Sequence, residues 1–216
     1  MNKKEFYRFI ERGALEGACR YFEYWYIYNH TPRGSRVLDI GAGRSALAQS
    51  LITKDCRVYA TDIDRSAINY QVKNGVISEL TDNLNSFGNY MFDVVVNASA
   101  IEHFDPENDG DIKAIEEVKR VLKPKGLFII ALPTGSKYIK SRKHTSTAPS
   151  EKVYSKEEFE KRFLNGFELI HSEFYIGTSK TPTDFIPHKT WNGLTNFEIA
   201  NNFGDGIGLC AVLKKL

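Results

Sequence analysis

Short apolar segments alternate with amphipathic ones along most of this chain. Phe92–Asn97 is apolar and rich in β-branched residues, which predicts a buried strand. Ile112–Leu122 carries apolar residues at helical spacing, and Ser155 with Glu158 is typical of a capped helix start. Further strands are expected at 36–40, 57–61, 76–80, 127–132, 167–174 and 207–214, and further helices at 3–28, 45–53 and 65–74.

Strands that alternate with helices indicate an α/β fold with a doubly wound, mostly parallel sheet of seven strands. The last two strands, 167–174 and 207–214, lack a convincing crossover helix, although 196–202 offers a short one. We therefore predict that they pair antiparallel at the sheet edge, which makes the final strand antiparallel. The loops after the parallel strands should build the site.

A glycine-rich turn follows the first of these strands, in Val-Leu-Asp-Ile-Gly-Ala-Gly-Arg-Ser from Val37 to Ser45. Gly41 and Gly43 let the backbone approach a ligand with no Cβ in the way. Ser45 is a candidate cap for the next helix, where exposed N–H groups favour an anionic ligand group. A tight turn without a ligand is the alternative explanation.

Two acids end the second strand, Asp62 and Asp64. A carboxylate at this position is suited to accept both hydroxyls of an adenosine ribose. Asp64 precedes the helix that starts near Ser66, so capping accounts for it. Asp62 has no such local explanation in the sequence, and we expect it to hold the ribose.

With these residues the chain resembles the class I S-adenosylmethionine-dependent methyltransferases. Four motifs appear in order between Val37 and Pro133: the glycine turn, the acid Asp62, the strand and loop from Phe92 to His103, and Val-Leu-Lys-Pro-Lys-Gly from Val121 to Gly126. The resemblance implies their fold, with an antiparallel final strand, and S-adenosyl-L-methionine as cofactor with S-adenosyl-L-homocysteine as product.

The resemblance also assigns a cofactor site. Asp39 and the turn would hold the methionine part, Asp62 the ribose, Ile63 and Asp82 the adenine, while Asn97 and Ala98 would lie beside the cofactor. The full set is Asp39, Gly41, Ala42, Gly43, Ser45, Asp62, Ile63, Asp82, Asn97 and Ala98.

Two other functions stay open on the sequence. An NAD(P)-dependent oxidoreductase would use the same turn, since Gly41 to Ala46 satisfies the loose dinucleotide pattern. Asp39 argues against this, because it suits a cationic amine better than a pyrophosphate. A non-catalytic module that binds the cofactor is the other alternative.

Glu102 and His103 follow the fourth strand, beside the expected cofactor. His103 is a candidate general base, and a structural role for the pair is the alternative. Ubiquinone-pathway O-methyltransferases bind a metal at a similar Glu-His pair with an acid three residues earlier. Here that earlier position is Ser99, so no metal is expected.

Two long connections, 134–154 and 177–206, should form a lid over the acceptor. Lys140 and Arg142 belong to a basic cluster suited to an anionic group, such as the phosphate of a nucleotide-linked sugar; a solvated loop is the alternative. Trp191 is a second acceptor-binding candidate. The lid histidines His144 and His188 join His103 as candidate bases. O-methylation of a small polar acceptor is favoured, with a phenolic or quinol acceptor as the alternative.

Composition bounds the remaining possibilities. The 216 residues, 42% of them hydrophobic, suit one methyltransferase domain with an N-terminal helical cap over residues 1–30. A net charge of +2 argues against nucleic-acid partners, and the apolar runs are too short for a membrane span. Three scattered cysteines and the lack of a signal-peptide core favour the cytoplasm. The dense N-terminal aromatics leave room for a homodimer contact.

Overall fold

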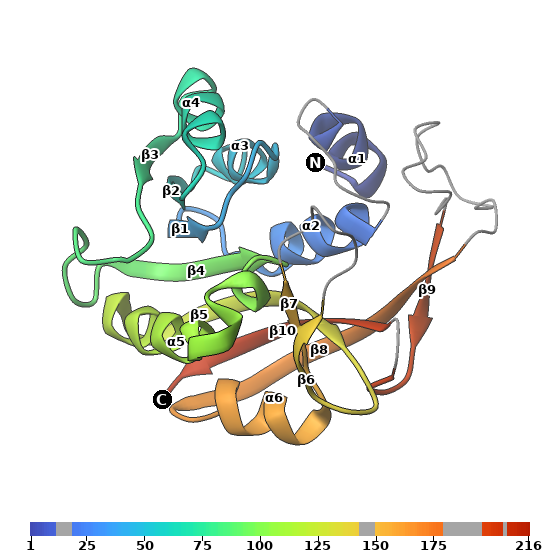
Figure 1. The fold of residues 1–216 in the computed structure, drawn as a ribbon. Helices are drawn as coiled ribbons and strands as arrows, with labels where there is room; N and C mark the ends of the chain where they lie inside the picture. The colour runs from blue at the N-terminus through green and yellow to red at the C-terminus, as the bar shows by residue number, and fades with distance from the viewer. Residues whose placement is uncertain (12–18, 143–149, 179–195, 205–206) are drawn as a thin grey trace.

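The computed structural model describes residues 1–11, 19–142, 150–178, 196–204 and 207–216. A central sheet with helices on both sides organises this part of the chain (Figure 1). Its helices are α1 (Lys3–Ile10), α2 (Cys19–His30), α3 (Leu47–Ile52), α4 (Arg65–Lys73), α5 (Gly110–Val121) and α6 (Lys156–Phe163), with short 3₁₀ turns η1 (Ile101–His103) and η2 (Pro106–Asn108). No described helix is long and apolar enough to cross a membrane.

The sheet has the predicted mostly parallel topology. Its order is β3-β2-β1-β4-β5-β10-β8-β9, and β10 runs antiparallel to both of its neighbours. The antiparallel pairing expected for the last two predicted strands is therefore confirmed. The strands are β1 (Arg36–Ile40), β2 (Arg57–Asp62), β3 (Ile77–Leu80), β4 (Phe92–Ala98), β5 (Leu122–Thr134), β8 (Phe167–Thr178), β9 (Asn196–Ala200) and β10 (Ile207–Lys215).

The edge of the sheet differs from the expectation. Residues 196–200, for which a short helix was considered, form the strand β9, which pairs antiparallel with β8. The sheet thus gains an eighth strand, and the β8–β10 pair lies one strand in from the edge. Pairing with β8 satisfies the backbone of β9, which a local sequence pattern does not reveal.

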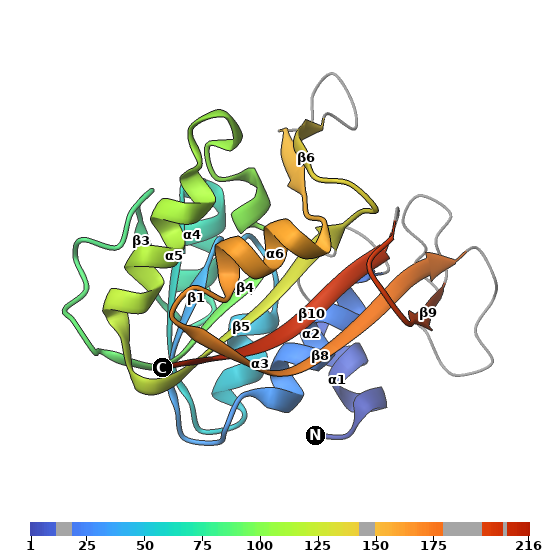
Figure 2. The same ribbon diagram turned by 90° about the horizontal axis from the view of Figure 1, so that it is seen from below.

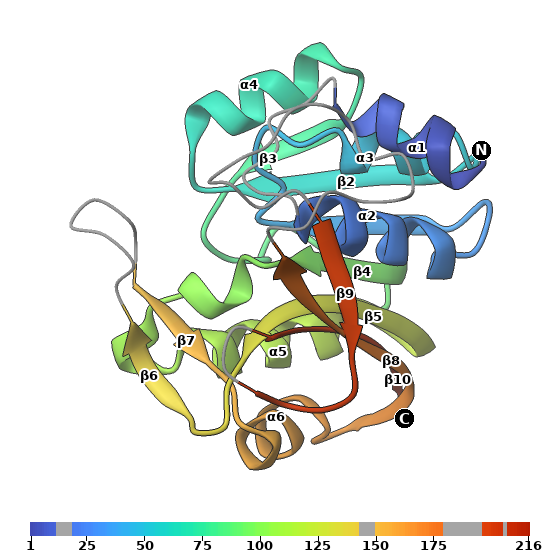
Figure 3. The same cartoon turned by 90° about the vertical axis from the view of Figure 1, so that its right-hand side faces the viewer.

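Two apolar clusters fix the layers of the fold. One joins α1, α2 and α3 to one face of the sheet, and the other joins α5 and α6 to the opposite face. Helix α2 lies between the sheet and α1, so it is buried on most sides (Figure 3). Five of its aromatic side chains are buried: Tyr21, Phe22, Tyr24, Tyr26 and Tyr28.

The first of the two expected lid loops contains a β-hairpin. Strands β6 (Ile139–Arg142) and β7 (Glu151–Val153) pair antiparallel and form a separate two-stranded sheet (Figure 2). Lys152 on β7 is completely buried, and its ammonium lies 3.1 Å from the equally buried carboxylate of Asp111 on α5. The Tyr154 hydroxyl donates to the same carboxylate at 3.0 Å. These contacts fasten β7 to the helical layer.

We expect Asp111→Asn to lower the free energy of unfolding by about 3–5 kcal/mol, since it leaves the buried Lys152 ammonium without a counter-charge. Urea unfolding followed by circular dichroism measures the change. Asp109→Asn is the matched control, because its carboxylate is about half exposed and its partner Arg162 keeps Asp111 and Glu158; it should cost less than about 1 kcal/mol. An equal loss of unfolding free energy in the two variants would show that the buried pair of Asp111 and Lys152 stabilises the fold no more than the exposed pair does.

Candidate functional site

The carboxyl ends of β1, β2 and β4 meet at a tight backbone turn. After β1, the N–H groups of Gly41 and Ala42 donate to the Thr61 carbonyl at 2.9 and 3.1 Å, which ties the turn to β2. Gly41 and Gly43 have φ values of 70° and 56°, in the left-handed region that other residues adopt only with strain. The backbone conformation of this turn therefore favours glycine at both positions, as predicted.

The two glycines differ in what surrounds them. A Cβ on Gly41 would lie 2.5 Å from the Cβ of Ala100, in the loop after β4, whereas a Cβ on Gly43 would meet nothing within 4 Å. Gly41 lets the loop after β1 pack against the loop after β4. At Gly43 the backbone is uncovered on the side where a Cβ would stand. That open side is where a ligand can approach the main chain closely.

Asp39, two residues before Gly41, is the most unusual group here. Its side chain is 1% exposed, and its Oδ2 atom has no hydrogen-bond partner among the described residues. Burial, and to a smaller extent the nearby Asp62, raise the pKa of Asp39 to about 7. A buried carboxylate oxygen with no donor suits a cationic group brought by a ligand.

The two acids after β2 behave differently. Asp64 caps α4, accepting from the Ser66 N–H at 2.8 Å and the Ser66 hydroxyl at 2.6 Å. Asp62 accepts from the N–H groups of Gly43 and Asp64, both at 2.8 Å. The expectation that Asp62 lacks a local role was wrong, because it also holds the glycine turn in place. Each carboxylate oxygen has a further lone pair with which to accept a ligand hydroxyl.

Two other predicted residues lie beside Asp62. Ile63 is 77% exposed, which leaves an apolar side chain uncovered at the end of β2. Asp82 is exposed in the turn after β3, where Asn83 donates to it. The Thr81 N–H donates to the Asp62 carbonyl at 3.0 Å, so this turn adjoins the end of β2. The structure thus brings Asp62, Ile63 and Asp82 together at the carboxyl ends of β2 and β3.

Asn97 and Ser45 have internal partners. The Asn97 amide donates to the Ile40 carbonyl at 2.8 Å and accepts from the Ile101 N–H at 3.0 Å, so it ties β1 to the loop that follows β4 and Ala98. Ser45 is not the N-cap of α3, because that position is Ala46, which has no side-chain bond; the Ser45 hydroxyl nevertheless accepts from the Leu47 N–H in the first turn at 3.4 Å. The Ser45 hydroxyl also donates to the Ala42 carbonyl at 3.0 Å, which tightens the turn.

Helix α2 supplies polar groups that the sequence analysis missed. Glu23 is 1% exposed; it pairs with Arg20 and accepts from the hydroxyls of Ser99 and Tyr175. These partners come from α2, the loop after β4, and β8, so no local spacing links them. The only available signal was two charged residues within a run of aromatic ones, which predicts that they are buried and paired.

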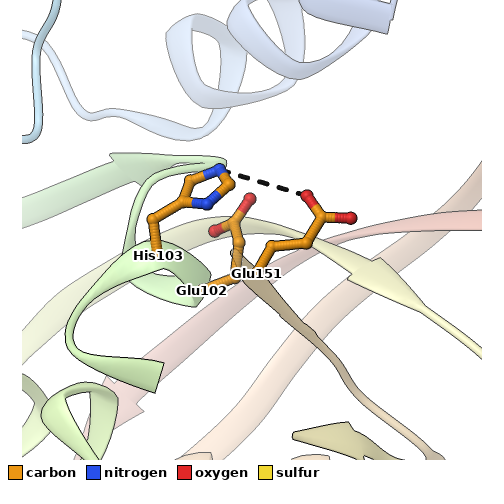
Figure 4. A group of neighbouring side chains, drawn as sticks. All are labelled: Glu102, His103 and Glu151. Carbon is orange, nitrogen blue, oxygen red and sulfur yellow. Dashed lines mark ion pairs between the residues drawn. The ribbon is translucent and has the colours of Figure 1, made fainter. Parts of the chain in front are cut away.

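Glu102 and His103 meet a third group that lies far away in sequence. Figure 4 shows Glu102, His103 and Glu151 of β7 together, with one ligating atom of each within 4.8 Å of the others. The Ser150 carbonyl lies 3.0 Å from His103 Nδ1. Burial raises the pKa of Glu102 to about 8, assisted by Glu151 and Glu23 and opposed by Arg20.

The basic cluster of the first lid is only partly described. Arg142 contacts Glu151 through Nε at 3.0 Å and through Nη2, so its charge is already balanced within the hairpin. Lys140 is exposed on β6. The other candidates, His144, His188 and Trp191, lie outside the described residues.

A family model described as a methyltransferase domain matches residues 38–130. A comparison with curated proteins gives no match. Among solved structures, a SAM-dependent methyltransferase of Thermotoga maritima, possibly a histamine N-methyltransferase, is 16% identical with a TM-score of 0.58, covering 97% of this chain and 91% of that one.

Two further solved structures are similar. The Burkholderia thailandensis 1,6-didemethyltoxoflavin-N1-methyltransferase, with 1,6-didemethyltoxoflavin and S-adenosylhomocysteine bound, is 17% identical with a TM-score of 0.66, covering 93% of this chain and 79% of that one. A SAM-dependent methyltransferase of Methanosarcina mazei is 18% identical with a TM-score of 0.64, covering 88% and 96%. At these identities the likeness is one of fold.

The two glycines give a test of the turn. We expect Gly41→Ala to cost about 2–5 kcal/mol of unfolding free energy, since it combines left-handed strain with a clash against Ala100. Gly43→Ala, with strain alone, should cost about 1–2 kcal/mol. Urea unfolding of both variants measures the difference. A Gly43 variant as unstable as the Gly41 variant would contradict the packing described for Gly41.

Proposed function

We propose that this chain, which belongs to the class I S-adenosylmethionine-dependent methyltransferases, transfers the methyl group of that cofactor to a small polar acceptor. The methyltransferase-domain match over residues 38–130 confirms the family indicated by the four motifs. The observation that carries the cofactor is the buried oxygen of Asp39, which lacks a donor within the described part of the chain. The cationic amine of the cofactor's methionine part supplies that donor.

The surrounding residues fit the remaining parts of the cofactor. The open backbone side of Gly43 admits the methionine part past Gly41 and Ala42. Asp62 retains lone pairs for the ribose hydroxyls, and the exposed Ile63 offers an apolar surface to the adenine ring. Asp82 is the proposed partner of the adenine amino group. Ser45, Asn97 and Ala98 shape the turn and loop that border this site.

An NAD(P) cofactor fits these residues less well. A pyrophosphate next to the buried Asp39 would place like charges together in a region with little solvent, which costs free energy. The cationic amine of S-adenosylmethionine would instead be attracted to the Asp39 carboxylate. This favours the methyltransferase over the oxidoreductase that the glycine turn alone also permits.

The cofactor's methyl group is already activated, so the protein's main task is to align the acceptor with it. A base is needed only where the acceptor atom carries a proton. His103, on η1 after β4, is the proposed base among the described residues, with 31% of its side chain exposed. His144 and His188 remain proposals from the lid segments.

For the acceptor we propose a sugar or a nucleotide-linked sugar, methylated on oxygen. The β6–β7 hairpin packs against η1, through the contact between His103 and the Ser150 carbonyl, so Lys140 on β6 belongs to the same side of the molecule. Lys140 is exposed and suits a phosphate. Arg142 pairs with Glu151, so we assign it to shaping the hairpin as well as to acceptor binding; Trp191 is the proposed apolar contact.

Calorimetry with S-adenosylmethionine and with NAD tests the cofactor, and we expect binding of the former alone. A methyl-transfer screen of nucleotide sugars against phenolic and quinol acceptors then tests the acceptor. Lys140→Ala should raise the KM of a phosphate-bearing acceptor and leave cofactor affinity unchanged. Lys161→Ala on α6, also exposed, is the control. Methylation confined to aromatic acceptors and insensitive to Lys140 would overturn the sugar proposal.

Asp39→Asn should weaken cofactor binding about tenfold to a hundredfold, as for loss of a hydrogen bond to a charged group. For the wild type, affinity should fall as pH drops below about 7, because the proton on Asp39 must leave before the amine can pair. Calorimetry between pH 6 and 8.5 measures both effects, and Asp55→Asn, at an exposed acid, is the control.

The same variant should be more stable than the wild type without cofactor. The pKa of Asp39 is raised in the folded state, so the wild type loses stability as pH rises from about 4 to 7. Above pH 7 the asparagine variant avoids this cost, by about 1–4 kcal/mol. A variant less stable than the wild type at pH 8 would show that Asp39 has a stabilising partner.

A further inference from the structure

We propose that Glu102, His103 and Glu151 bind a divalent metal cation. The three residues come from η1 and β7, and their ligating atoms lie within 4.8 Å of one another. One imidazole and two carboxylates form a donor set suited to Mn²⁺ or Zn²⁺. In Figure 4 the two carboxylates and the ring turn toward a common point.

His103 is prepared for ligation by its backbone contact. A carbonyl only accepts, so the 3.0 Å contact with Ser150 places the proton on Nδ1. The lone pair of the neutral ring is then on Nε2, which lies 4.0 Å from Glu151 Oε2. Metal-binding histidines commonly donate their other ring N–H to a carbonyl, which fixes the tautomer and the ring orientation.

Glu102 supplies the observation that calls for a ligand. It is 2% exposed, and its Oε2 has no hydrogen-bond partner among the described residues. The nearby cationic side chains are directed to other carboxylate atoms: Arg20 contacts Glu23, and Arg142 contacts Glu151 Oε1. A buried carboxylate oxygen left in this way is costly unless a cation or a proton compensates it.

The distances fit a metal with modest adjustment. Metal–ligand bonds of about 2.1 Å separate two ligand atoms by roughly 3 to 4.2 Å. The 4.0 Å between His103 Nε2 and Glu151 Oε2 lies in this range, and the widest separation of 4.8 Å exceeds it by an amount that a glutamate side chain can close by rotation.

The position of Glu151 is set by its neighbours on β7. Side chains alternate along a strand, so Glu151 faces His103 while Lys152 and Tyr154 face Asp111. These buried contacts hold β7 rigidly enough to present Glu151. The third ligand is thus supplied by the hairpin, although the residue three positions before Glu102 is Ser99.

A cation here would offer a binding point for an oxygen of the acceptor, as metal ions do when they orient a substrate and lower its pKa. While Nε2 of His103 binds the cation it cannot accept a proton, so the cation would take the place of His103 in activating the acceptor. Only this use of the site rests on the proposed function. Cation binding itself can be measured without cofactor or acceptor, so the two proposals fail independently.

The test uses the full chain, treated with a chelator and then dialysed. Titration with Mn²⁺, followed by electron paramagnetic resonance of the free ion, should reveal one saturable site. Glu102→Gln, His103→Gln and Glu151→Gln should each weaken binding at least about tenfold, since even the loss of a residue that only hydrogen-bonds to a metal ligand costs about 10–100-fold. Glu107→Gln, an exposed acid nearby in η2, is the control and should bind as the wild type does.

Melting temperatures in chelator check that each variant is folded. Should Glu102→Gln unfold, His103→Gln at its partly exposed position answers the same question. Absence of Mn²⁺ binding, or binding that all three variants retain, would overturn the proposal. Zn²⁺ calorimetry repeats the comparison with an ion that favours nitrogen ligands, and the same three variants must lose affinity there.

Discussion

The site is organised around the carboxylate of Asp39, which the fold buries away from solvent. Asp39 lies near the end of β1, where strands β2 and β4 flank it, and its side chain is almost completely buried. Desolvation raises its pKa to about 7, and the glycine turn beside it leaves backbone open to a ligand. A ligand that brings a cation to this point offsets the free-energy cost of burying the Asp39 carboxylate. The affinity for such a ligand therefore depends on the charge state of Asp39.

Local patterns predicted the layers and the glycine turn after β1, because the relevant information is local. Periodicity marks the buried faces of β4 and α5, and the turn at Gly41 and Gly43 depends on backbone angles that only nearby residues determine. The strand β9 escaped prediction because its partner β8 is distant in sequence. The hairpin of β6 and β7 escaped for the same reason, since Asp111 on α5 anchors it.

The surroundings of Glu102 and Arg142 were predicted less well, and the reason is again distance along the chain. A spacing argument looked for a third acid at Ser99, three residues before Glu102, whereas the fold brings Glu151 to that neighbourhood. The same tertiary contact changes the interpretation of Arg142, which seemed part of a free basic cluster and in fact balances Glu151. Charge counts within a loop therefore overstate what the loop can offer to an anionic acceptor.

Consecutive residues of strand β7 face opposite sides, so some stabilise the fold while their neighbour faces the candidate site. Lys152 and Tyr154 face the helical layer and bind Asp111, where a buried ion pair is stabilising only while all its partners are present. Glu151 faces the opposite way, toward His103. Because strand geometry separates the two sets, the buried contacts can fix the strand while the other face presents the Glu151 carboxylate to His103. The position of Glu151 relative to η1 therefore depends on the contacts of Asp111, about 40 residues earlier.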